Sequence, residues 1–221
     1  MKIVTLIIVL LALQFSTFAQ EVLLKIPVSG KSIKDFIPKD YEIKDSISGD
    51  LNKDGLKDIV LVLSHLQEDT FEMDEEPKRL LLILFKSAVG FKLSGKSSEV
   101  VMCRHCGGMY GDPYSQLDIT KGVLSIEHYG GSSWRWTETR KFRYQQNGFY
   151  LIGSTSNLFW NVQDCDGKGI GEAGKNFKDI NYLTGDEVII EKTEDCKLVK
   201  DIKQKQPKKP LVKLEAFKYE L

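Results

Sequence analysis

The chain has 221 residues, and its 31 Lys and Arg residues balance its 31 Asp and Glu residues, so the formal net charge is zero. This balance gives no reason to expect a nucleic acid as partner, because such partners attract proteins with an excess of positive charge. The length suffices for one domain, or two small ones, with a hydrophobic core that needs no covalent reinforcement.

The first residues, MKIVTLIIVLLALQFSTFAQ, have the features of a secretory signal peptide. Lys2 gives a basic start, residues 3–13 are apolar, and residues 17–19 (Thr-Phe-Ala) provide the small residues that a signal peptidase reads. We expect cleavage after Ala19 and a secreted or periplasmic protein. A membrane anchor is the alternative, but the apolar run is shorter than the ~20 residues that span a bilayer, so we expect no stable membrane insertion.

Strands dominate the sequence after a predicted short helix near residues 32–36. Residues 58–63 (DIVLVL) and 79–85 (RLLLILF) are continuous apolar runs, which are typical of strands covered on both faces. The acidic stretch between them, residues 67–78, is predicted to be a solvated loop. Residues 90–97 (GFKLSGKS) are predicted to form a third strand that pairs back across a turn.

A second group of strands follows, in two predicted hairpins. Residues 115–131 indicate a hairpin that turns at Lys121-Gly122, and residues 132–156 another that turns at Asn147-Gly148. In the second hairpin, alternation places four aromatic residues on one face and a polar, basic row on the other. These aromatic residues are Trp134, Trp136, Phe142 and Tyr144. We expect them to be core residues; the alternative is an exposed platform for sugar or peptide.

The last part of the chain is rich first in glycine and then in lysine. Residues 156–181 are predicted to be irregular, and residues 181–193 to return to a strand. Residues 197–213 contain seven lysines and two prolines, which predict an extended, solvated arm.

We therefore expect a signal peptide (1–19), a β-rich domain (20–196) and a basic C-terminal arm (197–221). The fold class is mainly β, with antiparallel meanders in propeller-blade-like sheet units and little helix.

The stretch DLNKDGLKD, residues 50–58, places acidic and amide side chains at every second position directly before a strand. Calcium prefers many hard oxygen ligands around one point. The candidate ligands are the side chains of Asp50, Asn52, Asp54 and Asp58 and the backbone carbonyl of Leu56. Gly55 allows the sharp turn at positive φ that such a loop needs. The alternative is a solvated turn without a metal.

Residues 50–63 resemble the FG-GAP or VCBS-type repeat of integrin α-subunit propellers and of many secreted bacterial proteins. In that family the Asp-x-Asn-x-Asp-Gly-x-x-Asp loop binds calcium between blade strands, so the resemblance implies a calcium site here. The chain shows one clear copy, and Leu61 stands where an EF-hand has its bidentate Glu. The rest of the chain is similar to exported bacterial proteins of unknown function with a Cys-x-x-Cys-Gly-Gly stretch.

Four cysteines follow the signal peptide: Cys103, Cys106, Cys165 and Cys196. An even number in an oxidising compartment favours disulfides, and four cysteines allow three pairings that the sequence does not distinguish. We prefer Cys103–Cys106 and Cys165–Cys196, because each pair then closes within its own region. The alternatives at Cys103-x-x-Cys106 are a zinc site with His105 and His128, or a redox dithiol.

Other motifs are weaker. Residues 169–174 match a dinucleotide fingerprint and residues 169–175 the first part of a phosphate loop, but no βαβ pattern surrounds them. Asp164 and Asp166 are a candidate second calcium site. The chain contains neither Gly-x-Ser-x-Gly nor His-Glu-x-x-His, two signatures of hydrolytic enzymes.

The sequence favours an exported bacterial calcium-binding module that is not catalytic and that recognises a protein or glycan at the cell envelope. The rival interpretation is a secreted or periplasmic enzyme, either a hydrolase or a thiol oxidoreductase at Cys103 and Cys106. A structural envelope protein is the third. An open cleft with converging acids would favour the enzyme, and an exposed patch at Trp134 and Trp136 would favour binding.

Overall fold

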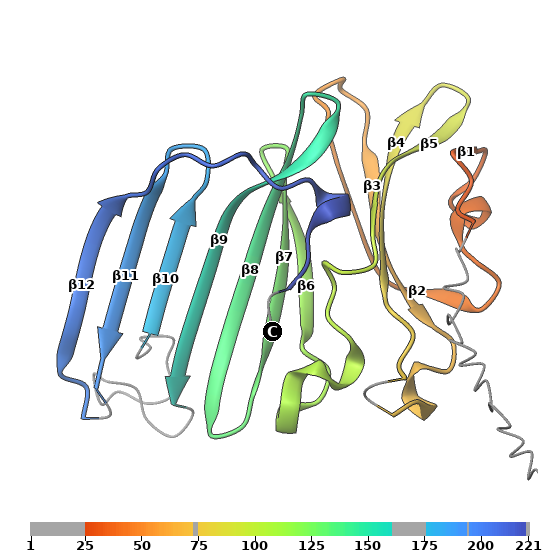
Figure 1. Cartoon of the computed structure of the whole chain (residues 1–221). Coiled ribbons are helices and arrows are strands. Elements are labelled where there is room, and N and C mark those ends of the chain that lie inside the picture. The colour runs from red at the N-terminus through yellow and green to blue at the C-terminus, as the bar shows by residue number, and fades with distance from the viewer. Residues whose placement is uncertain (1–24, 73–74, 161–175, 194, 220–221) are drawn as a thin grey trace, which may run out of the picture.

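The computed structural model describes residues 25–72, 75–160, 176–193 and 195–219. These residues form two antiparallel sheets, which confirms the predicted mainly-β fold (Figure 1). The predicted signal peptide, Cys165 and the weak motifs at 164–175 lie outside the described residues. Within the described ranges, no helix has both the length and the apolar character needed to cross a membrane.

Sheet A has five strands in the order β1-β5-β4-β3-β2. They are β1 (Ser29–Gly30), β2 (Tyr41–Gly49), β3 (Asp58–His65), β4 (Leu80–Ser87) and β5 (Gly90–Ser97). Two single-turn 3₁₀ helices accompany them, η1 (Ile33–Phe36) and η2 (Glu68–Thr70). The bounds of η1 and β5 lie where the sequence predicts them.

The central strands of sheet A are buried on both faces, as their continuous apolar runs predict. Val60 and Ile83 belong to the core between the two sheets, whereas Leu61 and Leu82 belong to a second cluster on the opposite face. The N-terminal segment covers that second face, with Phe36 fully buried against it.

Sheet B has seven strands in the order β12-β11-β10-β9-β8-β7-β6. They are β6 (Tyr114–Thr120), β7 (Val123–Gly131), β8 (Trp134–Gln145), β9 (Gly148–Trp160), β10 (Asn176–Asn181), β11 (Asp186–Lys192) and β12 (Leu198–Lys205). Two further 3₁₀ helices are η3 (Arg104–Tyr110) and η4 (Leu214–Ala216). Strands thus extend into the stretch 156–181 predicted to be irregular, because the end of β9 pairs with both β8 and β10.

Both predicted hairpins are present. The β6–β7 hairpin turns at Lys121 and Gly122, as predicted. The β8–β9 hairpin turns at Gln146 and Asn147, one residue earlier than predicted. Both of those residues have positive φ, 49° and 58°, which a two-residue type I′ turn requires.

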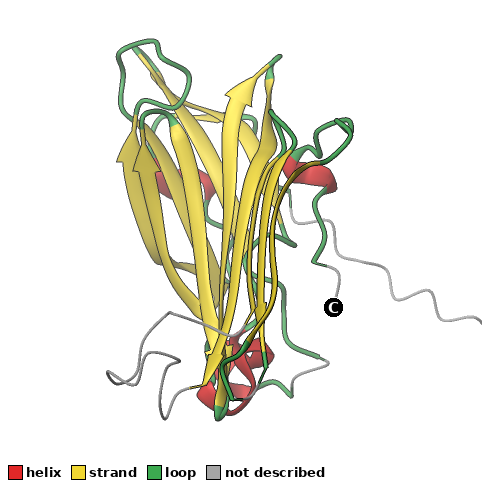
Figure 2. Ribbon diagram, turned by 90° about the vertical axis from the view of Figure 1, so that its left-hand side faces the viewer, coloured by secondary structure: helices red, strands yellow, loops and turns green. Residues whose placement is uncertain are grey.

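The core lies between sheet A and the part of sheet B formed by β6–β9. Phe142 and Phe149 are fully buried there, and the face of sheet B that carries Phe142 is called the inner face below. The sheets approach closely at β2 and β6, where a Cβ on Gly49 would lie 2.7 Å from Ile119 Cγ2. Figure 2 shows that the strands of both sheets run in nearly the same direction. Strands β10–β12 extend beyond sheet A, so no second sheet of described residues faces them (Figure 1).

The lysine-rich end of the chain is part of the folded domain, which differs from the predicted solvated arm. Residues 198–205 form edge strand β12, and the chain then returns across sheet B to η4 (Figure 1). Leu214 is fully buried and Phe217 nearly so. The lysines suit an edge strand, because charged side chains there prevent pairing with other chains. The apolar residues that follow them anchor the segment in the core.

Candidate functional site

A buried arginine joins the two sheets at one end of the core. Arg79 precedes β4 and is fully buried. Its Nε and Nη2 donate to the Glu68 carboxylate at 2.9 Å each, and Nη1 and Nη2 donate to Asp112 at 2.7 and 2.8 Å. The fifth N–H donates to the carbonyl of Met102 at 3.1 Å. All five guanidinium donors are therefore used.

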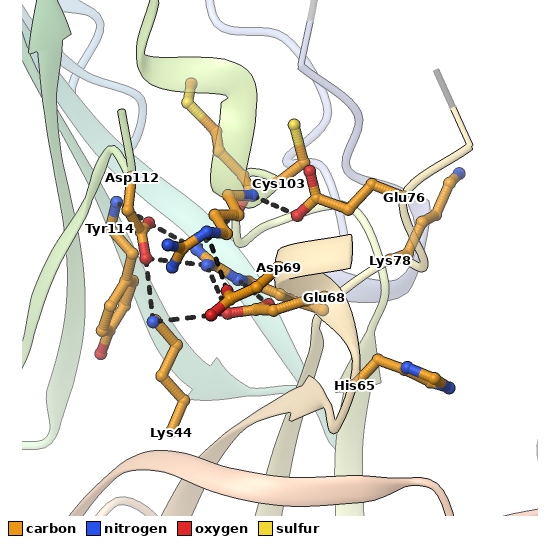
Figure 3. A network of polar contacts seen from close by, with 12 residues as sticks. Lys44, His65, Glu68, Asp69, Glu76, Lys78, Cys103, Asp112 and Tyr114 are labelled. Carbon is orange, nitrogen blue, oxygen red and sulfur yellow. Dashed lines mark hydrogen bonds and ion pairs between the residues drawn. The ribbon is translucent and has the colours of Figure 1, made fainter. Parts of the chain in front are cut away.

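Lys44 completes this network, since its Nζ lies 2.8 Å from Asp112 Oδ2 (Figure 3). Two cations thus face two carboxylates, and the charges balance. Burial alone raises the pKa of Asp112, but the hydrogen bonds from Arg79 and Lys44 outweigh it and lower the pKa to about 2. A network with matched charges and complete hydrogen bonds is suited to holding the sheets together.

The Cys103–Cys106 disulfide, predicted from the sequence, is present with Cα atoms 5.1 Å apart. It lies at the start of η3, where the backbone N–H groups of Arg104 and His105 donate to the carboxylate of Glu76. The predicted pairing of Cys103 with Cys106 is therefore confirmed. Cys196 is not a free thiol either, and its predicted partner Cys165 lies outside the described residues.

The two histidines considered as zinc ligands have other partners. His105 Nδ1 contacts Glu76 Oε2 at 3.0 Å. His128 is buried, and its Nε2 accepts a hydrogen bond from the Met102 N–H at 3.2 Å. Because the two sulfur atoms are bonded to each other in this structure, neither is present as a thiolate ligand for zinc. No group of three His, Cys, Asp or Glu side chains suited to a metal occurs in the part of the chain that the structure describes.

His128 also fixes the hydroxyl of Tyr219, near the end of the chain. Burial lowers the pKa of His128 to about 3, so the ring is neutral at physiological pH. Because Nε2 accepts a hydrogen bond, the ring proton lies on Nδ1 and is donated to Tyr219 Oη at 3.1 Å. The hydroxyl hydrogen of Tyr219 is then directed away from His128.

The predicted calcium loop is a tight turn between β2 and β3. Asp50 accepts hydrogen bonds from the N–H groups of Asp54 and Gly55, at 3.2 and 3.0 Å. Asn52 Oδ1 accepts from the same Asp54 N–H at 3.0 Å, so three of the predicted ligands surround one turn. Gly55 has φ of 86°, as the sequence predicts for this position. Asp54 Oδ1 accepts from the Leu56 N–H at 2.8 Å and Asp54 Oδ2 from Asn52 Nδ2 at 2.9 Å, so these side chains bond to the backbone of the loop and to one another.

Asp58 differs from the other predicted ligands because it is fully buried. Its Oδ2 accepts from the Leu51 N–H at 2.9 Å, and its Oδ1 accepts from the Lys86 N–H at 3.0 Å. Burial raises the pKa of Asp58. Leu51 is itself a core residue, so the loop is held at both ends. Leu56, whose carbonyl is a predicted ligand, is exposed.

A cleft of about 860 Å³ opens on the inner face of sheet B, next to the core, and is called the first cleft. Its floor includes Trp136 and Glu138 of β8 and Lys178 of β10, and its wall includes Met102 and the Cys103–Cys106 disulfide. Glu138 Oε1 accepts a hydrogen bond from Arg140 at 2.9 Å. Its Oε2 is buried and has no hydrogen-bond partner among the described residues.

The tryptophans of β8 are not core residues, which corrects the prediction for two of the four aromatic residues. Phe142 is fully buried, but Trp134 and Trp136 are half-buried and lie outside both core clusters. Trp136 lines the first cleft, and Trp134 stacks on Trp160 with ring centroids 6.4 Å apart. The alternation is as predicted, but sheet A covers only the second half of β8.

A second cleft, of about 670 Å³, lies on the same inner face, where residues 206–219 cross it. Lys178 and Tyr219 line both clefts, so the two are contiguous. The basic residues that line the second cleft are Arg140, Lys178, Lys208, Lys209 and Lys218. Among the described residues, Glu187 is the one acid that lines it, so the described part of the lining has an excess of 5 − 1 = 4 positive charges.

Comparison of the chain with protein-family models finds no match, and comparison with curated proteins finds none either. No local pattern of the sequence predicts the Arg79 network or the two clefts. The one available signal was Arg79 itself, a charge at the head of the apolar run RLLLILF.

Proposed function

We propose that the chain is an exported β module that binds calcium at residues 50–58 and recognises a ligand in the first cleft without catalysing a reaction. The observation that carries the recognition part is the cleft itself. Its volume of about 860 Å³ lies in the range of small-molecule sites, ~300–1,000 Å³. A half-buried tryptophan, Trp136, lines it.

The half-buried indole of Trp136 supports a binding role. It offers the first cleft a large apolar surface, which binds a ligand without needing a charge. Trp136 does not belong to either core cluster, so packing alone does not explain its position.

The calcium part is supported by the position of Asp50, Asn52 and Asp54 around one turn at the entry to β3. Calcium would reduce the repulsion between the carboxylates of Asp50 and Asp54 and fix the entry to that strand. The export part is supported by the N-terminal sequence, with its basic start, apolar run and small residues before Gln20.

A binding role without catalysis is supported by the partners of the charged groups that line the first cleft. Its three described carboxylates each form an ion pair: Glu99 with Lys78, Glu138 with Arg140 and Glu191 with Lys200. Arg79 uses all five of its donors within the buried network.

Thermal unfolding with a panel of soluble probes tests the recognition part. The panel contains neutral and acidic oligosaccharides, tripeptides of each net charge, and free amino acids. We expect one class to raise the melting temperature of the wild type and to have no effect on Trp136→Ala. Equal shifts in both proteins, or no shift with any class, would contradict a ligand site in the first cleft.

A further inference from the structure

The charges of the two clefts indicate the chemical class of the ligand. This inference rests on the proposed function. The first cleft is lined by three cations, Lys78, Arg79 and Lys178, and by three carboxylates, Glu99, Glu138 and Glu191. The charges of these described residues sum to 3 − 3 = 0, so this part of the lining is neutral. The described lining of the second cleft carries an excess of four positive charges, in which Lys178 and Arg140 are paired with Glu187 and Glu138, whereas Lys208, Lys209 and Lys218 form no ion pair with a described residue.

The charges of the first cleft are also paired within the protein. Lys78 binds Glu99, and Glu138 binds Arg140. Lys200 Nζ lies 3.0 Å from Glu191 Oε1, and Lys178 Nζ lies 3.2 Å from Glu187 Oε1. A charged group entering this cleft would have to compete with an existing ion pair. The first cleft is therefore better suited to an uncharged, polar part of a ligand.

The Tyr219 hydroxyl, on a side chain that lines both clefts, suits a ligand with hydroxyl groups. It accepts a hydrogen bond from His128 Nδ1, and its own hydrogen is directed away from His128. A ligand hydroxyl serves as donor and acceptor and can accept that hydrogen. Trp136 provides the flat apolar surface on which the C–H face of a sugar ring packs.

A peptide is less suited to this surface. The floor consists of β8, β9, β10 and β11, each paired to neighbours on both sides. Interior strands of a sheet offer no unpaired backbone groups with which an extended peptide could form a ladder. Recognition here depends on side chains.

We propose that the contiguous clefts form one site for an acidic saccharide. An uncharged part of a sugar unit lies against Trp136 and Glu138 in the first cleft. A carboxylate of the same oligosaccharide points toward Lys208, Lys209 and Lys218 in the second cleft. Opposite charge attracts the ligand to the basic end, and the aromatic end fixes its orientation.

Isothermal titration of the full chain with tetragalacturonate and with the uncharged galactotetraose tests this proposal. At about 50 mM salt we expect the acidic tetrasaccharide to bind about tenfold more tightly. That advantage should shrink at about 500 mM salt, because salt screens the attraction to the lysines. Equal affinity for both sugars, or no binding of either, would overturn the proposal.

Three variants, each checked for folding by circular dichroism, sharpen the test. Trp136→Ala should weaken both sugars, whereas Lys208→Gln combined with Lys209→Gln should remove only the preference for the acidic one. Lys197→Gln is the matched control, because Lys197 is 80% exposed and lines neither cleft. An unchanged preference in the double variant would contradict the role of the second cleft.

The probe panel and the sugar titrations together distinguish a failure of this inference from a failure of the proposed function. If tripeptides stabilise the wild type through Trp136 and neither sugar binds, recognition in the first cleft stands and the saccharide proposal fails. If no probe of any class binds, both fail.

Discussion

Arg79 and Asp112 form a bidentate ion pair, with Nη1–Oδ1 and Nη2–Oδ2 distances of 2.7 and 2.8 Å, which connects sheet A to the start of sheet B. Because the guanidinium is fully buried, removing it leaves Glu68 and Asp112 with Lys44 as their one remaining cation in this network. We expect Arg79→Met to lower the free energy of unfolding by about 3–5 kcal/mol, as measured by urea denaturation.

Arg104→Met is the matched control for this prediction. Arg104 Nε lies 2.9 Å from Asp69 Oδ1, but both side chains are exposed, 38% and 66%. Exposed ion pairs contribute about 0–1 kcal/mol. Similar losses in the two variants would show that the buried network does not connect the sheets.

The same network predicts how stability depends on pH. The pKa of Asp112 falls from 3.8 to about 2 on folding, so its stabilisation is complete above the unfolded value and is lost as the pH falls toward 2. The contribution is roughly 2 kcal/mol. We expect the stability difference between the wild type and Asp112→Asn to narrow by this amount between about pH 5 and pH 2. A constant difference would mean that Asp112 is not an ion-pair partner.

Phe142 and Trp136 share one face of β8 but have different roles. Phe142 is fully buried in the core, and Phe142→Ala should cost about 3–5 kcal/mol. Trp136 is half-buried at the first cleft, and we expect Trp136→Ala to cost about 1–2 kcal/mol, because part of its area is already in contact with water. Urea denaturation distinguishes the two. Equal costs would place Trp136 in the core and remove the argument for a binding role.

Calcium binding is predicted at residues 50–58. Extracellular calcium modules have dissociation constants of about 10⁻⁴–10⁻³ M. At ten times that concentration, calcium adds about 1.4 kcal/mol of stability, which raises the melting temperature by a few degrees. We expect Asp54→Ala to remove this response and Asp69→Ala, which removes an exposed acid outside the loop, to keep it. Isothermal titration of folded, metal-free protein that shows no heat at millimolar calcium would contradict the prediction.

The strands and hairpins were predictable because alternation and turn residues act locally. The apolar runs at 58–63 and 79–85 predicted strands β3 and β4 and also predicted that both faces of these strands are buried. The lysines after residue 197 were misleading, because composition does not show that Ile202 pairs with Ile189 or that Leu214 enters the core.

The site depended on contacts between distant parts of the chain. Arg79 meets Asp112 across 33 residues, and His128 meets Tyr219 across 91. No local sequence pattern shows that residues so far apart in the chain come into contact. The width of sheet B relative to sheet A decides which aromatic residues of β8 are covered, so the sequence alone could not separate Phe142 from Trp136.

Nuclear magnetic resonance of the tryptophan indole N–H groups tests recognition in the first cleft most directly. The chain has three tryptophans, and single substitutions assign their three signals. The protein is titrated with tetragalacturonate and with the tripeptides and sugars of the probe panel. For a compound that binds, the Trp136 signal should shift at a lower concentration than the signals of Trp134 and Trp160. Compounds that bind but shift only the signals of Trp134 and Trp160, the stacked pair outside the first cleft, would contradict it.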